Sequence, residues 1–154
     1  MFSKTCKYGL RAVLYLASQA QEDHKLGVKQ VAAALEVPQP FLAKLLQQLA
    51  RVQIISSAKG PNGGFYLSDK NLVANLRQVV ECLDGPDVFS SCILGLPSCS
   101  SANPCPLHQQ AVAYRNSLLD VMERQTIREV AQRIGAPEYA QSPLSLLIKK
   151  DNQP

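Results

Sequence analysis

Hydrophobic residues recur at the spacing of an amphipathic helix in three segments of the first third of the chain, over residues 8–21, 28–36 and 40–50. The second segment ends before Pro38, since a residue before proline avoids helical geometry, and Pro40 suits the first turn of the third. The third helix is polar on its outward face. Two short helices joined by a tight turn predict a helix-turn-helix.

Two strand-like runs follow, over residues 54–58 and 65–68, separated by Lys59-Gly60-Pro61-Asn62-Gly63-Gly64. Turn-forming residues between two such runs predict a β-hairpin. A hairpin directly after the helix pair makes a winged helix, whose glycine-rich tip lets the backbone approach DNA. The alternative is an ordinary tight turn beside a solvated lysine, but the helix pair and the hairpin together favour the wing.

The second half of the chain predicts a fourth helix over 72–83, a non-periodic stretch over 87–106, and a long helix over 107–124. The middle stretch is too long for a simple connection, so we expect it to be functional. Thr126 and Glu129 form a capping box that starts a separate short helix over 127–134. The apolar stripe of the long helix is expected to pack on a second subunit, with packing inside one chain as the alternative.

The predicted fold is mainly α with a small β-hairpin wing. It divides into a winged helix-turn-helix DNA-binding domain over residues 1–85, a cysteine-rich cluster-binding loop over 86–106, a dimerisation helix with a short capping helix over 107–134, and a tail over 135–154. We expect the tail to be partly disordered, although its apolar residues could dock on the rest of the chain; these are Leu144, Leu146, Leu147 and Ile148.

Charge is unevenly distributed along the 154 residues, whose net charge is +4. Residues 1–70 hold nine Lys or Arg against four acids, so the first half is the candidate polyanion-binding part. A hydrophobic content of 46% predicts a folded domain and excludes a disordered chain. The sequence has no apolar run that could span a membrane and no secretory signal, so we expect a cytoplasmic protein.

Three of the five cysteines lie in the irregular loop, and a histidine follows three residues after the last of them; these residues are Cys92, Cys99, Cys105 and His108. Thiolates and an imidazole suit zinc and iron-sulfur clusters alike, and the spacing does not separate the two. Inert cysteines or a disulfide are the weaker alternatives. Cys82 is expected in the core, and Cys6, just ahead of the first helix, is either a partly exposed thiol or an extra ligand.

The opening Lys7-Tyr8-Gly9-Leu10-Arg11-Ala12, the helix pair, the wing and the three-cysteine loop before a long helix resemble the bacterial IscR, NsrR and RirA family of transcription regulators. The resemblance covers residues 1 to about 134. It implies a DNA-binding winged-helix homodimer whose three cysteines bind a [2Fe-2S] or [4Fe-4S] cluster, with His108 as the fourth ligand. The nitric-oxide sensors have an acidic ligand near the first helix where this chain has Lys7 or Tyr8, which favours His108.

The sequence therefore predicts a homodimeric transcription regulator that binds a pseudo-palindromic site on double-stranded DNA. We expect Gln39, Lys44, Gln47 and Gln48 to face the major groove, and Lys59, Gly60, Asn62, Gly63 and Gly64 to face the minor groove or the backbone. One alternative keeps the fold but fills the loop with zinc, or leaves a thiol redox switch. Another, an electron carrier or a cysteine-dependent enzyme, leaves the wing unexplained.

Overall fold

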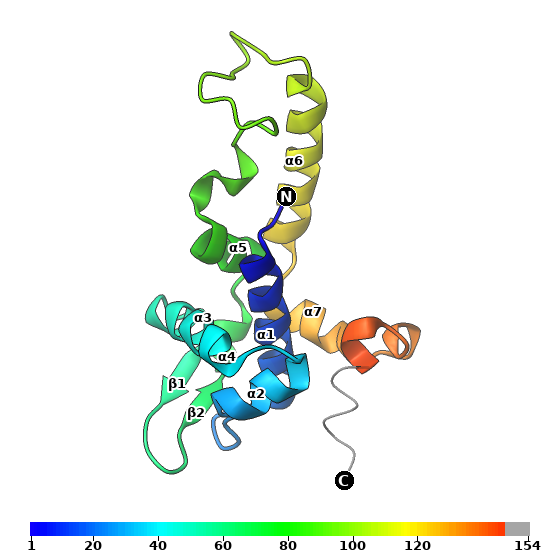
Figure 1. The fold of residues 1–154 in the computed structure, drawn as a ribbon. Coiled ribbons are helices and arrows are strands. Elements are labelled where there is room, and N and C mark those ends of the chain that lie inside the picture. Colours follow the sequence, from blue (N-terminus) through cyan, green and yellow to red (C-terminus); the bar gives the residue numbers. More distant parts are fainter. Residues whose placement is uncertain (147–154) are drawn as a thin grey trace.

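The computed structural model describes residues 1–146, which form a mainly helical chain with one small hairpin (Figure 1). In chain order the elements are α1 (Lys4–Gln19), α2 (Val28–Leu35), α3 (Gln39–Arg51), β1 (Ser56–Ala58), β2 (Gly64–Tyr66), α4 (Asp69–Leu72), α5 (Leu76–Asp84), the 3-10 turn η1 (Pro86–Phe89), α6 (His108–Arg124), α7 (Ile127–Ile134) and the 3-10 turn η2 (Pro137–Tyr139).

The turn between α2 and α3 is tight. Glu36 adopts a left-handed conformation, with a φ of 56°, and the amide of Val37 returns to the carbonyl oxygen of Ala32. Four leucines of α3 are at most 2% exposed; they are Leu42, Leu45, Leu46 and Leu49. Because burying each leucine contributes about 1.5–3 kcal/mol, this face fixes α3 on the core and leaves its polar face outward. The predicted helix pair is confirmed.

The hairpin is antiparallel, with Ser57 opposite Phe65. Its strands are shorter than predicted, because the pairing begins only at Ser56, opposite Tyr66; Ile54 and Ile55 precede β1 and are buried in the core, at 6% and 1% exposure. Phe65 also exchanges backbone hydrogen bonds with Leu26, which joins the segment before α2 to the hairpin. Helix pair and hairpin together form a winged helix.

The fourth predicted helix, over 72–83, is wrong as a single element. Ser68 caps the short helix α4 and Asn75 caps α5, and each side-chain oxygen accepts a hydrogen bond from the backbone amide three residues on. Each cap starts a new helix because it satisfies an amide that has no partner inside that helix, and the cap at Asn75 falls inside the predicted segment and divides it. The capping box predicted at Thr126 and Glu129 is confirmed.

The main hydrophobic core is built from α1, α2, α3, α5 and α7. A smaller cluster of Cys6, Val80 and Phe89 contacts Leu118 and Leu119 of α6. The placement predicted for Cys6 is wrong, because α1 begins at Lys4 and Cys6 in its first turn is completely buried against Val80 and Phe89. Cys82 packs against the main core, as predicted. Figure 1 shows α6 rising from the body with the cysteine loop at its far end and the wing at the opposite end.

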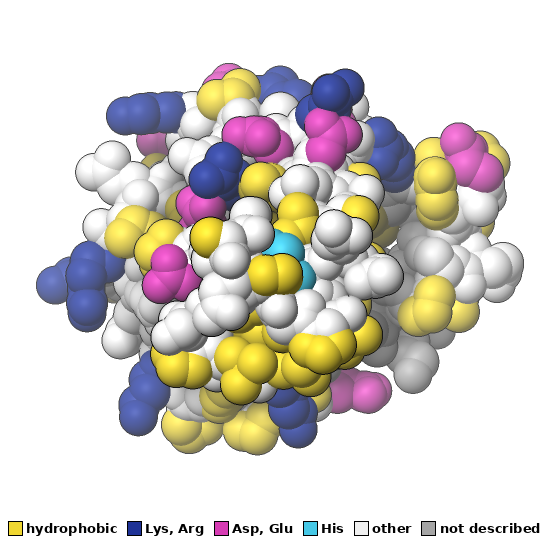
Figure 2. Space-filling model, turned by 90° about the horizontal axis from the view of Figure 1, so that it is seen from above, with side chains coloured by type: hydrophobic (Ala, Val, Ile, Leu, Met, Phe, Trp, Pro, Cys, Tyr) yellow, Lys and Arg dark blue, Asp and Glu magenta, His cyan; other side chains and the backbone are white. Residues whose placement is uncertain are grey.

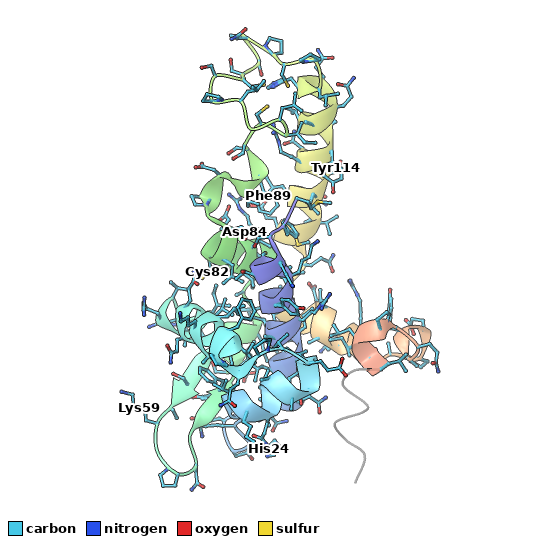
Figure 3. All side chains as sticks on the ribbon, viewed as in Figure 1. His24, Lys59, Cys82, Asp84, Phe89 and Tyr114 are labelled. Carbon is cyan, nitrogen blue, oxygen red and sulfur yellow. The ribbon has the colours of Figure 1, made fainter. Side chains whose placement is uncertain are left out.

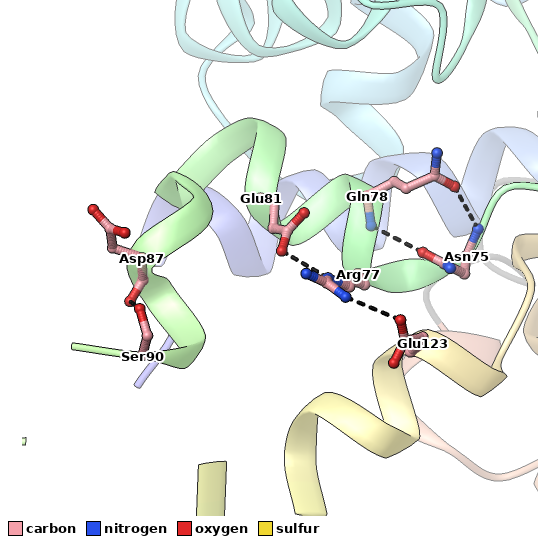
Figure 4. A network of polar contacts seen from close by, with 7 residues as sticks. All are labelled: Asn75, Arg77, Gln78, Glu81, Asp87, Ser90 and Glu123. Atoms are coloured by element: carbon pink, nitrogen blue, oxygen red, sulfur yellow. Dashed lines mark hydrogen bonds and ion pairs between the residues drawn. The ribbon is translucent and has the colours of Figure 1, made fainter. Parts of the chain in front are cut away.

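An ion-pair network joins α5 to α6 (Figure 4). Arg77 Nε lies 2.7 Å from a carboxylate oxygen of Glu81, one helical turn along α5, and Arg77 Nη1 lies 2.9 Å from Glu123 of α6. Exposed pairs contribute little stability individually. The network lies beside the apolar contacts of Leu118 and Leu119 with Val80, which pack α6 against α5.

Part of the C-terminal segment docks on the body. Leu144 packs against the main core, and the buried Ser145 donates a hydrogen bond to the carbonyl oxygen of Ile134. Leu146 stays 43% exposed, so its docking is not borne out, and Leu147 and Ile148 lie outside the described residues. Within residues 1–146, every helix is too short or too polar to cross a membrane. The division into separate domains stays a prediction.

Candidate DNA-binding face and metal centre

The outward face of α3 carries polar side chains. Gln39, Lys44, Gln47 and Gln48 are all exposed, opposite the four buried leucines. The outward face of such a helix is the one that can enter a major groove, where glutamine pairs with adenine and lysine with guanine or phosphate. The role of these four residues at DNA stays a prediction.

Gln48 differs from its neighbours on α3. Its side-chain amide donates a hydrogen bond to the carbonyl oxygen of Cys82 on α5, at 2.8 Å. In this structure its amide is directed at α5 and not outward. Sequence spacing alone could not reveal this, since the partner lies 34 residues along the chain.

The wing tip is a turn built on glycines. Gly60 has a φ of +101° in open space, and the amide of Gly63 donates to the carbonyl oxygen of Gly60 at 2.9 Å. Gly64 has a φ of +147°, and a Cβ there would lie 2.7 Å from the carbonyl oxygen of Leu26. The tip can therefore approach another backbone closely. Lys59 is exposed beside it and lies at the end of the molecule away from the cysteine loop (Figure 3).

Two cationic contacts near this face escaped the sequence reasoning. Lys25 Nζ lies 5.3 Å from the ring centre of Tyr66, and Arg11 lies 5.2 Å from that of Tyr8. Tyr8 in turn packs edge-on against Phe41 of α3. Cation–π contacts hold long side chains in place at modest energy. The i, i+3 spacing of Tyr8 and Arg11 on α1 was the available signal.

The cysteine loop brings its three thiols together. The Sγ atoms of Cys92 and Cys105 lie 3.8 Å apart, and all three sulfurs, including that of Cys99, lie within 4.8 Å of one another. The cysteines come from irregular backbone between η1 and α6, where no helical or strand geometry fixes their spacing. The predicted convergence of three cysteines is present in the structure.

His108, the first residue of α6, adjoins this triad. Its Nδ1 lies 3.2 Å from Cys99 Sγ and its Nε2 lies 3.5 Å from the hydroxyl of Ser101. A hydrogen-bonding partner on one ring nitrogen orients the other toward a metal. The arrangement offers three sulfur donors and one nearby nitrogen.

The surroundings of the thiols shift their pKa values in different directions. The backbone amides of Leu96 and Leu94 lower the pKa of Cys92 to about 7, because they stabilise its thiolate. Cys99 accepts a hydrogen bond from the amide of Cys105, which favours its thiolate, but burial and the thiols of Cys105 and Cys92 together raise its pKa above the ordinary value.

Cys6 is a different kind of thiol. Burial, followed by the nearby carboxylate of Asp84, raises the pKa of Cys6 to about 12. Asp84 itself accepts hydrogen bonds from the backbone amide and the hydroxyl of Ser3, the residue that caps α1. Cys6 is therefore a protonated core residue and not a ligand. Figure 3 shows Cys82, Asp84 and Phe89 in succession between the level of α3 and the loop.

The donor set fits a thiolate-binding metal centre. Sulfurs about 2.3 Å from one tetrahedral ion lie about 3.8 Å from each other, and Cys92 and Cys105 have this spacing. Three thiolates with one imidazole also suit an iron-sulfur cluster. Around the site, Ile93, Leu94 and Leu96 are 60%, 52% and 49% exposed. Figure 2, seen from this end, shows a histidine among hydrophobic side chains and the white atoms of other side chains and the backbone.

Comparison with known proteins places the chain in a family. The family model named Rrf2 and described as an iron-dependent transcriptional regulator matches residues 2–133. The transcriptional regulator NsrR of Shouchella clausii is 33% identical over 132 residues, which cover 80% of this chain and 83% of that protein.

Two solved structures share the fold. CymR of B. subtilis, the global cysteine regulator, matches with a TM-score of 0.70 at 20% identity, over 86% of this chain and 97% of that one. IscR of T. potens matches with a TM-score of 0.66 at 19% identity, over 86% and 87%. The family model spans the helix pair, the wing, the cysteine loop and α6, and the chain therefore belongs to the Rrf2 family of transcriptional regulators.

Proposed function

We propose that this regulator is a homodimer that binds double-stranded DNA through α3 and the wing and senses redox, nitric-oxide or iron status through an iron-sulfur cluster. Cys92, Cys99 and Cys105 would hold the cluster, with His108 as the fourth ligand. The observation that carries the proposal is the convergence of three sulfurs within 4.8 Å on the chain that also carries a winged helix.

The surface of the winged helix supports the DNA-binding part. Lys44 and Gln47 are exposed on α3, and Lys59 stands beside a wing tip whose glycines leave the backbone accessible. Side chains on the helix can read base edges, while the lysine and the backbone amides of the wing can contact phosphates. We therefore assign base recognition to α3 and positioning on the duplex to the wing.

Two observations support a cluster. The family is described as iron-dependent, and relatives and structural neighbours carry the names NsrR and IscR. The second is His108 at the start of α6, whose Nδ1 lies 3.2 Å from Cys99 Sγ and adds a nitrogen beside the three sulfurs. A bound cluster would supply a charge that changes with oxidation state or is lost with the cluster. The cysteines hold it, and the loop transmits its state to α5 and α6.

The exposed face of α6 supports a dimer. Tyr114 and Val121 are 48% and 53% exposed, seven residues apart and thus on the same side of the helix. A second copy of this chain is the expected occupant, because a symmetric dimer presents two α3 helices to two half-sites of one palindrome.

Zinc is the second candidate for the site. It is favoured by the 3.8 Å between the Sγ atoms of Cys92 and Cys105, which is the spacing of two thiolate ligands on one tetrahedral ion. Bound zinc would give the loop a structural role. Release of the zinc would leave free thiols that can act as a redox switch. The DNA-binding part of the proposal is the same in both cases.

Absorption and Mössbauer spectra of anaerobically purified protein test the metal centre. We expect a brown protein that loses its colour in Cys92→Ala, keeps it in the control Cys82→Ala, and changes its spectrum in His108→Ala. A colourless protein with one zinc per chain would support the second candidate. A colourless protein without metal would refute both.

The DNA-binding part is tested independently with duplexes selected from a random pool. We expect a symmetric footprint with half-sites about one helical turn apart and an affinity that falls steeply with salt. An asymmetric site bound by a monomer would contradict the proposed dimer.

A further inference from the structure

Arg115 lies on the side of α6 that faces the cysteine loop. It follows His108 by seven residues, or two helical turns, so the two side chains share one face. Its Nη1 donates a hydrogen bond to the carbonyl oxygen of Ser91, the residue before Cys92. The loop is thus attached to α6 at two levels, by Arg115 near its start and by His108 at Cys99.

Ser91, whose carbonyl oxygen accepts the hydrogen bond from Arg115, is also hydrogen-bonded to η1. The amide and the hydroxyl of Ser91 both donate to the carbonyl oxygen of Asp87, at 2.8 and 2.7 Å. Ser91 is therefore fixed between η1 and α6, although the backbone after it is irregular. Because Cys92 is the next residue, this attachment fixes the starting point of the first thiol of the triad.

The Nε–H group of Arg115 takes no part in the hydrogen bonds between α6 and the loop. It is buried and has no hydrogen-bond partner among the described residues. Leaving a buried donor unpaired is costly, more so on a charged group, and such donors call for an explanation. A guanidinium also keeps its positive charge at any physiological pH. Three thiolates carry more negative charge than one divalent ion neutralises, so a fixed cation at the start of the loop favours the loaded site.

We infer that Arg115 is a positioning residue of the metal centre, which holds Cys92 in place for coordination through the Ser91 carbonyl. The inference rests on the proposed metal-binding function. In the metal-bound site, the positive charge of the guanidinium would offset the negative charge of the thiolates, and the unpaired Nε–H would be available as a hydrogen-bond donor. A purely structural clamp would hold η1 to α6 without any effect on metal affinity.

Cobalt(II), whose thiolate complexes absorb strongly, is the probe for the test. The reduced full-length protein is titrated with cobalt in competition with a chelator, as wild type, Arg115→Gln, Arg115→Lys and Arg124→Gln. The last is a matched control, an exposed arginine of the same helix that pairs with Asp120. Because outer partners of metal ligands are worth about 10–100-fold in affinity, we expect Arg115→Gln to lose that much, Arg115→Lys to fall between, and Arg124→Gln to match wild type.

Hydrogen exchange of the metal-free proteins gives a second readout. We expect faster exchange over residues 88–95 in Arg115→Gln and no change in the rest of the chain, which also shows that the variant folds. Unchanged cobalt affinity in Arg115→Gln overturns the inference, whether or not exchange changes. Failure of wild type to bind cobalt at the triad refutes the proposed metal centre instead, so the two failures are distinguishable.

Discussion

The side-chain amide of Gln48 on α3 donates a hydrogen bond to the backbone carbonyl oxygen of Cys82 on α5, with the two atoms 2.8 Å apart. Two residues further along, Asp84 ends α5 and accepts hydrogen bonds from Ser3, and η1 and the cysteine loop follow. The helix expected to read DNA is thus joined by a direct contact to the helix that leads to the cysteines. In the proposed function, this hydrogen bond is one contact through which we expect a change in the position of α5 to reach α3.

Gln47 and Gln48 should respond differently to truncation. Gln47→Ala removes an outward side chain, so we expect operator affinity to fall by about 1–3 kcal/mol if Gln47 reads a base, with unchanged stability. Gln48→Ala breaks the tie to α5, so we expect a loss of about 0.5–1 kcal/mol in stability. Fluorescence anisotropy with DNA and urea unfolding check both. An equal loss of affinity and no loss of stability in Gln48→Ala would contradict this division.

Lys59 should contribute to DNA affinity by neutralising a phosphate of the DNA backbone. Removing a lysine that neutralises one phosphate lowers the slope of log affinity against log salt by about 0.9, and we expect that change in Lys59→Ala. Arg133→Ala is the control, because Arg133 is exposed on α7, on the side of the body away from the wing in Figure 1. The measurement is a salt titration of DNA binding for the three proteins. An unchanged slope in Lys59→Ala would remove this residue from the DNA-binding face.

Substitution by alanine should lower the stability of the fold by different amounts at two glycines of the wing. Gly60 has positive φ but open space, so Gly60→Ala costs only the conformational strain, about 1–2 kcal/mol. In Gly64→Ala the new Cβ would also lie 2.7 Å from the Leu26 carbonyl oxygen, a backbone atom that cannot turn away. We therefore expect the larger destabilisation in Gly64→Ala by urea unfolding. The opposite order would contradict the contact between β2 and Leu26.

Cys6 should make stability depend on alkaline pH. Its folded pKa of about 12 lies above the value of about 8.5 in an unfolded chain, so between these values only the unfolded state loses the proton. The stabilisation is complete below about pH 8.5 and is lost as pH rises toward 12. Urea unfolding at about pH 8 and about pH 10.5, on either side of the unfolded pKa, should show a larger decrease for wild type than for Cys6→Ala. Equal decreases would show that Cys6 titrates normally.

The helices were predictable because their apolar faces are regular, and the leucines of α3 are buried as their spacing requires. The division of α4 from α5 was missed although its caps were visible in the sequence, because Ser68 closes the predicted strand run and Asn75 lies inside the helical periodicity of 72–83. Cys6 was misplaced for a similar reason. The first turn of α1 is capped by Ser3 ahead of the periodic residues.

The membership of the site was predictable, but its geometry was not. Cysteines in a loop can converge, and the sequence identified Cys92, Cys99 and Cys105 as a group. The orientation of Gln48 depends on a contact with α5 that no local pattern encodes. Arg115 was missed although its seven-residue spacing from His108 places both on one helical face.

In the proposed function, the regulator couples its cysteine site to its DNA-binding face. The most direct test of this coupling is the affinity of the anaerobically purified protein for a selected duplex, measured before and after a chelator or nitric oxide removes the metal centre. Coupled sites usually differ by about 5–150-fold, and we expect a change in that range that is absent in Cys92→Ala. Equal affinity before and after removal, in a protein whose metal centre was present at the start, would contradict the account.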